Sequence, residues 1–153
     1  MAHWLIKSEP DVFSIADLKA KKKTGWDGVR NYQARNYMRD GMKLGDLAFF
    51  YHSNAEPSGI AGVAKVCREA HPDPTQFEKD SDYFDPKATP QKPIWEMVEV
   101  EFVEAFPRVI SLAELKADKT LAALPLVQKG TRLSVMPVGE KEWNAILKIS
   151  KRG

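Results

Sequence analysis

The chain has 153 residues, of which 43% are hydrophobic and 29% are charged, a composition typical of one globular domain spanning residues 1–153. Its apolar runs are shorter than the ~18 residues of a membrane span, and its first residues lack the apolar core of a signal peptide. The single cysteine, Cys67, excludes an internal disulfide. We therefore expect a cytoplasmic protein without a membrane partner, and a monomer is the default state.

Positive charge is concentrated near the beginning of the chain. Residues 1–45 hold nine Lys or Arg against five Asp or Glu, a balance of +4, whereas residues 46–153 hold fourteen against sixteen, a balance of −2. A basic first third suits a surface that faces phosphate groups. The run Lys21, Lys22 and Lys23 contributes to it, although a short run of this kind is also typical of a solvated helix face.

The first half of the chain alternates strand patterns with helix starts. Ser14 and Asp17 form a capping box, which predicts a helix start, and Gly25 and Gly41 are the expected helix stops. The last two strand patterns of this half are separated by a short polar loop and resemble a hairpin. The expected elements are a strand at 3–8, a helix from Ser14, a helix at 31–39, and strands at 47–53 and 60–70.

The second half opens with a polar segment, residues 71–93, that is rich in Pro and Asp. Loops of this length are usually functional or mobile. The elements expected after it are a strand at 94–105 with Val98 and Val100 facing one way, a helix from Ser111, a strand within 126–138, and a helix around Trp143. Because the order lacks the regular alternation of a parallel sheet, the predicted fold class is mixed α/β (α+β).

The sequence offers little support for catalysis. His52 and Ser53 are adjacent on a predicted strand, so their side chains point to opposite faces and do not form a nucleophile–base pair. His71 near Asp73 fits an acid/base pair less well than a turn, and Cys67 fits a small buried residue better than a nucleophile. The histidines have no metal-ligand spacing, and no phosphate-cradling glycine motif is present. We therefore predict a non-enzyme without metal or cofactor.

Binding of a nucleobase fits the sequence better. The stretch GWDGVRNYQARNYMRDG, residues 25–41, combines an aromatic ring with planar cations and amides. A base needs a stacking face, which Trp26 could supply, and polar groups around its edge. The candidate edge readers are Ser8, Asn31, Ser53 and Asn54, and the candidate phosphate ligands are Arg30 and Arg35. Structural alternatives remain open: Trp26 as an ordinary core aromatic, Asn31 as a helix N-cap, and Trp4, Trp95 and Trp143 as core residues.

The chain resembles the EVE domain family through motifs that occur in the family's order over about residues 4–147. The motifs are WLIKSEP, WDGVRNYQARN, GDLAFFYHSN, GIAGVAKV, PDPT, YFDPK, IWEMVEVEF and RLSVMPV. The resemblance implies a PUA-like fold, a mostly antiparallel β-barrel with short peripheral helices, akin to YTH and ASCH domains. It also implies a non-catalytic module that binds DNA or RNA carrying a modified base, with 5-methylcytosine and its oxidised forms proposed for the family.

The resemblance carries roles over to named positions. A base-binding pocket would be formed by Ser8, Trp26, Asn31, His52, Ser53, Asn54 and Ser134, with Trp26 stacking on a flipped base by analogy with YTH domains. The nucleic-acid backbone would be held by Arg30, Arg35, Lys21, Lys22 and Lys23. A candidate lid comprises Tyr83, Phe84, Asp85 and Lys87.

Two other functions stay open at this point. One is an enzyme that acts on a modified nucleotide or base, with His52 or Asp27 as its acid/base. The other is a small-molecule-binding or protein-interaction module that uses the same cavity.

Overall fold

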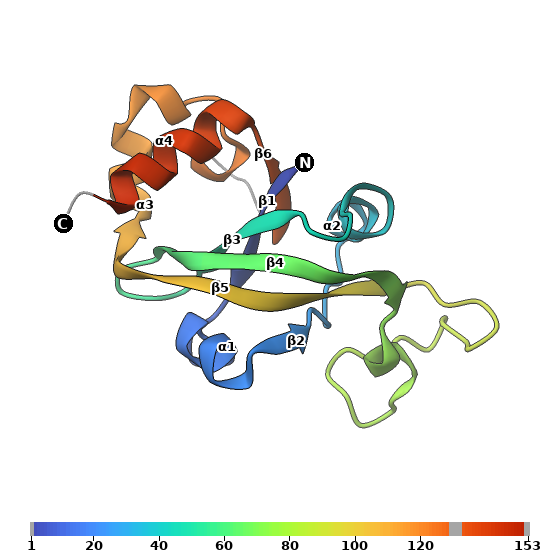
Figure 1. Cartoon of the computed structure of the whole chain (residues 1–153). Coiled ribbons are helices and arrows are strands. Elements are labelled where there is room, and N and C mark those ends of the chain that lie inside the picture. The colour runs from blue at the N-terminus through green and yellow to red at the C-terminus, as the bar shows by residue number, and fades with distance from the viewer. Residues whose placement is uncertain (1, 129–132, 152–153) are drawn as a thin grey trace.

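A single six-stranded sheet forms the centre of the computed structural model, which describes residues 2–128 and 133–151 (Figure 1). Its strands are β1 (His3–Ser8), β2 (Lys23–Gly25), β3 (Leu47–His52), β4 (Gly59–Pro72), β5 (Glu96–Ser111) and β6 (Val135–Val138). Their order across the sheet is β2-β5-β4-β3-β1-β6. Within the described chain β1 pairs with β3 in parallel and the other pairings are antiparallel, which confirms a mixed, mostly antiparallel fold.

Short helices cover the sheet. They are α1 (Ile15–Lys21), α2 (Tyr32–Asn36), which continues into a π-helical turn at Tyr37–Gly41, α3 (Leu112–Ala117) and α4 (Glu140–Ser150). The predicted capping box of α1 is confirmed, because the Ser14 hydroxyl accepts the Asp17 N–H at 3.1 Å and the Asp17 carboxylate accepts the Ser14 N–H at 2.8 Å. The predicted stop of this helix was wrong, since α1 ends at Lys21 and Gly25 lies in β2.

The core has two layers, one on each face of the sheet. Alternation along the strands places Leu5 and Phe49 in one cluster and Ile6 and Phe50 in the other. In Figure 1, α3 and α4 lie at the upper left of the sheet, α2 lies at its right, and α1 lies below the long β4–β5 pair. The central strands of the sheet are therefore buried on both faces. Their alternation also determines the direction in which the side chains at the strand ends point.

The predicted strands differ from the observed ones mainly in length. The strand expected at 60–70 runs over Gly59–Pro72, and the one expected at 94–105 runs over Glu96–Ser111, because β4 and β5 stay paired through several bulges. Strand β2 was not predicted, since its Lys-Thr-Gly sequence has no apolar alternation. No pairing joins the edge strands β2 and β6 within the described residues, so closure into a barrel stays a prediction.

The polar segment expected to be functional or mobile is hydrogen-bonded to the start of β5. Gln76 is completely buried, and its amide donates to the carbonyl oxygens of Asp73 at 2.7 Å and Trp95 at 2.8 Å. Its oxygen accepts the N–H groups of Ile94 and Trp95, both at 2.9 Å. Every polar atom of the Gln76 side chain is thus used to join the two ends of the loop.

We expect Gln76→Leu to lower the free energy of unfolding by about 3 kcal/mol, because the substitution leaves the N–H groups of Ile94 and Trp95 without acceptors and removes two further buried hydrogen bonds. Urea unfolding monitored by tryptophan fluorescence measures this. The matched control is Gln91→Leu, the same substitution at an exposed position of the same loop, which should change stability by less than about 0.5 kcal/mol. Equal effects of the two substitutions would contradict this role for Gln76.

Candidate functional site

The parallel pairing of β1 with β3 brings two of the sequence motifs to one end of the sheet. Ser8 lies opposite His52 in the register, and the Ser53 N–H donates to the Ser8 carbonyl at 3.0 Å. Because β6 runs antiparallel to β1, it starts at the same end, where the Lys7 N–H donates to the Ser134 carbonyl at 2.9 Å. The predicted convergence of Ser8, Ser53 and Ser134 is therefore present.

The opposite wall comes from the crossover that joins β1 to β3. After β2, the Trp26 N–H donates to the Val98 carbonyl at 2.7 Å, which holds the backbone of Trp26 beside β5. The indole then packs edge-to-face on Phe50, with ring centroids 5.4 Å apart and planes at 83°. Only 7% of Trp26 is exposed, so this ring is both a core residue and a wall of the site.

A cavity of about 720 Å³ lies between these walls. Seven of the predicted site residues line it: Ser8, Lys21, Trp26, Arg30, Ser53, Tyr83 and Ser134. The other lining residues were not predicted to bind nucleic acid, and they are Lys7, Glu9, Val12, Phe13, Thr24, Gly25, Asp27, Gly28 and Val29. A polar residue on a strand such as Lys7 has no sequence signal that separates it from a solvated one.

Asn31, His52 and Asn54 do not line the cavity, and their side chains have other contacts. Asn31 caps α2 by accepting the Ala34 N–H at 2.9 Å, as the structural alternative expected. His52 accepts the Ile15 N–H through Nε2 at 3.1 Å, and burial lowers the pKa of its imidazole. Asn54 donates to the carboxylate of Glu9, which does line the cavity. Direct base contacts by these three residues stay predictions.

Arg30 is a bridge between the crossover and the 73–95 loop. Its guanidinium donates to the Tyr83 carbonyl at 2.7 and 3.0 Å, to the Asp73 carboxylate at 3.1 Å and to the Thr75 hydroxyl at 3.0 Å. A further N–H bonds the carbonyl of Val29 at 2.9 Å. The donors that would hold a phosphate are thus engaged within the fold.

Arg35 and the candidate lid are also held in place. Arg35 donates to the Ile94 carbonyl at 2.9 Å and lies 4.9 Å from the centroid of the Tyr32 ring. Asp85 accepts the Trp95 indole N–H at 2.8 Å. Of the remaining lid residues, Tyr83 lines the cavity, Phe84 is half-buried and Lys87 is exposed. Phosphate binding by Arg35 and closure of the lid stay predictions.

Tyr83 is a fixed part of the cavity wall in this structure. Its ring rests on Gly28, where a Cβ would come within 2.7 Å of the ring atoms and where φ is +77°. That position needs glycine both for its backbone conformation and for the close approach of the ring. Because 41% of Tyr83 is exposed, its ring adds aromatic surface to the smaller area that Trp26 exposes in the cavity.

Two carboxylates near Trp26 have opposite pKa shifts. Burial favours the neutral form of Asp73, but hydrogen bonds from Thr75, Gly28 and Arg30 outweigh burial and hold the pKa of this carboxyl below its usual value. Asp27 reaches the surface, yet partial desolvation and the neighbouring Asp73 charge raise its pKa. Asp73 therefore has a structural charge, whereas Asp27 takes up a proton more readily.

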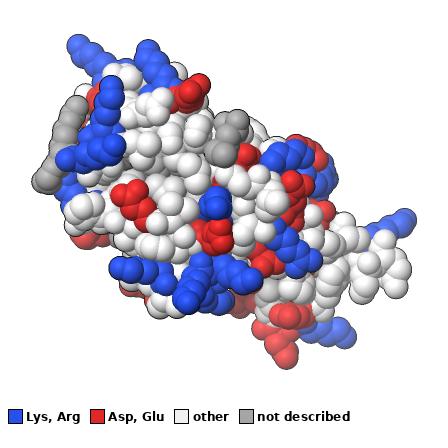
Figure 2. Space-filling view, in the orientation of Figure 1, with Lys and Arg blue, Asp and Glu red and all other residues white. Residues whose placement is uncertain are grey.

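Exposed Lys side chains lie beside the cavity. Lys21, Lys22 and Lys23, at the end of α1 and the start of β2, are all exposed. Figure 2 shows basic side chains gathered over α1 and β2, at the lower edge of the molecule in this view, with acidic side chains between them. This part of the surface therefore has the positive charge that the sequence predicted.

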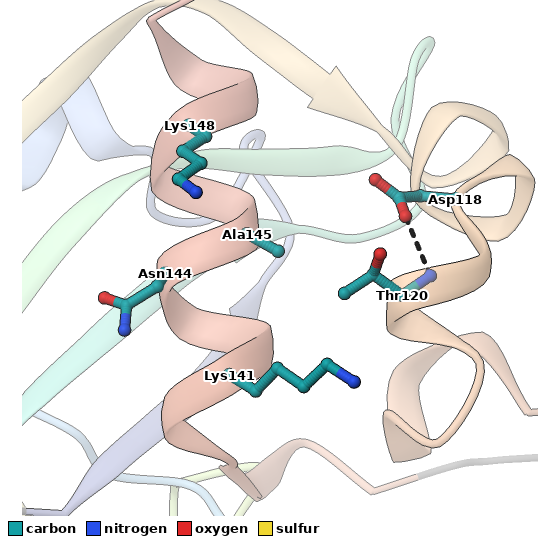
Figure 3. Close-up of a pocket in the computed structure, with 6 residues that line it drawn as sticks. All are labelled: Asp118, Thr120, Lys141, Asn144, Ala145 and Lys148. Atoms are coloured by element: carbon teal, nitrogen blue, oxygen red, sulfur yellow. Dashed lines mark hydrogen bonds between the residues drawn. The ribbon is translucent and has the colours of Figure 1, made fainter.

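A second, smaller hollow of about 420 Å³ lies between α4 and the 3-10 turn Lys119–Leu121 (Figure 3). Lys141 and Lys148 of α4 line it, and Lys141 extends toward the turn, while the Asp118 carboxylate accepts the Thr120 N–H at 2.9 Å. No aromatic side chain lines this hollow. It has no stacking face, and we treat the larger cavity as the candidate site.

The described part of the chain provides neither a membrane-spanning helix nor a cluster of potential metal ligands. No helix there is long and apolar enough to cross a bilayer. No three His, Cys, Asp or Glu side chains gather there to hold a metal ion. The suggested pair of His71 with Asp73 is also not formed, since the Asp73 carboxylate bonds Gly28, Arg30 and Thr75, and His71 lies 3.7 Å from the Glu99 carboxylate.

The sequence profile of the EVE domain matches residues 2–149. The chain belongs to the EVE domain family. It is 46% identical to human thymocyte nuclear protein 1 over 99% of this chain and 75% of that protein. A crystal structure from Pseudomonas syringae superposes with a TM-score of 0.95 at 53% identity, covering 97% of this chain and 99% of the other.

One similar structure also contains nucleic acid. It is human THYN1 protein in complex with 5-methylcytosine-containing DNA, with a TM-score of 0.94 and 45% identity over 100% of this chain and 99% of that chain. The EVE resemblance drawn from the sequence motifs is confirmed by these comparisons.

We expect the Asp73 charge to govern part of the acid stability of the EVE fold. Because its folded pKa lies below the ~3.9 of an unfolded aspartate, its contribution is present above about pH 5 and is lost as the pH falls through the folded value. Asp73→Asn should therefore cost about 1–3 kcal/mol at pH 7 and flatten the fall in stability below pH 5. Urea unfolding at a series of pH values tests this, with Asp80→Asn, an exposed aspartate of the same loop, as the control. A pH profile for Asp73→Asn parallel to that of the unchanged chain would contradict it.

Proposed function

We propose that this EVE domain is a non-catalytic reader of a modified base in DNA, with 5-methylcytosine as the first candidate. The observation that carries the proposal is the cavity at the converging ends of β1 and β3, walled by Trp26 and Tyr83. A volume of about 720 Å³ is ample for one nucleotide. The human relative crystallised with 5-methylcytosine-containing DNA supports DNA as the partner and this base as the mark.

In this proposal the base enters between the two aromatic walls. Stacking is worth about 1–3 kcal/mol per base, and burying one methyl group adds only about 0.8 kcal/mol, which gives a few-fold preference. Larger selectivity requires polar groups that the wrong base leaves unpaired. The methyl group therefore accounts for only part of the discrimination between a modified and an unmodified base.

The cavity offers acceptors as well as the donors of Lys21 and Thr24. The Ser8 hydroxyl donates its hydrogen to the Phe13 carbonyl at 2.7 Å, so only its lone pairs are available to a ligand. The carboxylates of Glu9 and Asp27 line the same cavity. Acceptors suit the exocyclic amino group of cytosine or adenine, whereas thymine and uracil present a carbonyl there. This favours an amino-bearing base.

Phosphates beside the flipped nucleotide are assigned to the exposed run Lys21, Lys22 and Lys23. Arg30 and Arg35 act indirectly in this proposal, because their guanidinium groups already hold the Tyr83 carbonyl and the Ile94 carbonyl. Asn31, His52 and Asn54 likewise support the walls through Ala34, Ile15 and Glu9. Extrusion from a duplex costs a few kcal/mol, so single-stranded DNA should bind more tightly than a matched duplex.

We expect Trp26→Ala to weaken binding of a single-stranded 11-mer with one central 5-methylcytosine by roughly 5–100-fold, through loss of stacking. Fluorescence anisotropy of a labelled strand measures the affinity. Removing a core indole also destabilises the fold by about 3–5 kcal/mol, so folding is checked by circular dichroism and Trp26→Phe serves as a milder variant.

The matched control is Trp143→Phe, because Trp143 is also buried but packs on Phe49 in the other core cluster. The proposal requires Trp26→Phe to reduce the preference for 5-methylcytosine over cytosine, and Trp143→Phe to leave it unchanged. A reader role for this cavity is ruled out if the unchanged chain binds all oligonucleotides equally or not at all.

The raised pKa of Asp27 at the cavity favours one second candidate, an enzyme that uses this carboxyl as acid/base. His52 is less suited to that role, since its Nε2 already accepts the Ile15 N–H. We expect no turnover: mass spectrometry of 5-methylcytosine and 5-hydroxymethylcytosine oligonucleotides after overnight incubation should show unchanged masses. A product that disappears in Asp27→Asn would instead establish an enzyme.

A further inference from the structure

Lys7 is a cation in the cavity for which the fold supplies no anion. It lines the cavity at the end of β1, and no carboxylate lies within ion-pair distance of its Nζ in the described part of the chain. Its Nζ instead lies over the ring of Tyr51, 5.6 Å from the ring centroid. Partial burial lowers the pKa of Lys7, and no neighbouring acid offsets that effect.

Two unused hydroxyl groups accompany this ammonium group. Ser53 and Ser134 line the same cavity, and neither hydroxyl has a hydrogen-bond partner among the described residues. The backbone N–H of Lys7 bonds the Ser134 carbonyl, and Ser53 bonds the Ser8 carbonyl at the next residue of β1. The end of β1 thus gathers one positive charge and two free hydroxyl donors.

Strand alternation separates this group from the acceptors around Trp26. Lys7 follows Leu5 on one face of β1, together with Tyr51 of the paired strand, whereas Ser8 follows Ile6 on the face that carries Trp26. Ser134 precedes Val135, the partner of Ile6, and so lies opposite Lys7. The lining of the cavity therefore combines Lys7, Ser53 and Ser134 from one face of β1 with Ser8 and Trp26 from the other.

We propose that Lys7, Ser53 and Ser134 form a phosphate site for the same nucleotide whose base lies beside Trp26. A phosphodiester oxygen accepts from an ammonium group and from hydroxyl groups, and it supplies the anion that Lys7 lacks. This inference rests on the proposed function and deepens it, since the cavity then holds a nucleotide and not a base alone. It also assigns Ser53 and Ser134 to the phosphate and no longer to the edge of the base.

The test combines a protein variant with a ligand that lacks one charge. Single-stranded 11-mers with a central 5-methylcytosine are prepared with normal linkages or with one methylphosphonate, which is uncharged, on the 5′ or the 3′ side of that residue. We expect the unchanged chain to lose about tenfold in affinity for one of the two neutralised strands. Lys7→Met should bind that strand and the normal strand equally, and Lys7→Arg should keep most of the difference.

The slope of log affinity against log salt gives a second readout. Loss of one phosphate contact on a single strand should reduce its magnitude by about 0.7 in Lys7→Met. Lys148→Met, which removes a lysine from the separate hollow shown in Figure 3, is the matched control and should behave as the unchanged chain. Circular dichroism checks that each variant is folded.

The outcomes separate this inference from the proposed function. Suppose that the unchanged chain still prefers 5-methylcytosine, but that Lys7→Met loses the same factor in affinity for the normal and the neutralised strands. Lys7 then contacts the base, and the phosphate site is overturned. The same holds if Lys7→Met has the affinity and salt slope of the unchanged chain. Absence of any preference for 5-methylcytosine in the unchanged chain overturns the proposed function itself, and a Lys7-dependent response to the neutral linkage would then remain as a phosphate site without a reader.

Discussion

The parallel pairing of β1 with β3 is the constraint on which the candidate site depends. Two parallel neighbours end on the same side of the sheet, and this places Ser8 beside Ser53. Parallel strands also require a long crossover, here residues 9–46, and that crossover carries Trp26 and Arg30. The parallel pairing therefore accounts for both walls of the cavity. The ends of β1 and β3 form the first wall, and the crossover that connects these strands forms the second.

The second wall is kept in place by a charge that the fold buries. Asp73 is inaccessible to solvent, and its carboxylate accepts from Gly28, Arg30 and Thr75 at once. An unpaired buried carboxylate would be costly, so these bonds must form together if the 73–95 loop is to dock. Through Arg30 the same network fixes the Tyr83 carbonyl and so its ring, which explains how a loop of Pro and Asp residues supplies an aromatic wall of the cavity.

The sequence predicted the secondary-structure elements, and the convergence of its motifs in space, better than it predicted individual side-chain contacts. Ser8, Trp26, Ser53 and Ser134 were placed together through the family resemblance, since motif order carries the topology. Phosphate binding by Arg30 stays a prediction, but the sequence does not reveal that its guanidinium bonds Asp73 within the fold, because an exposed cation and one turned inward look alike in a sequence. Lys7 was not predicted to line the cavity, because in the sequence it is simply the polar member of an alternating strand. That no carboxylate pairs with it is visible only in the structure.

The different chemistry of Ser8 and Lys7 in the cavity follows from the same strand geometry. Consecutive residues of β1 point to opposite faces, so the Ser8 hydroxyl and the Lys7 ammonium group line the cavity from opposite sides of the strand. A nucleotide has a matching polarity, with an amino group on the base of cytosine or adenine and an anionic phosphate on its backbone. In the reader that we propose, the methyl group contributes only about 0.8 kcal/mol, so the polar contacts set the position of the base and the aromatic walls discriminate the methyl group by their closeness to it.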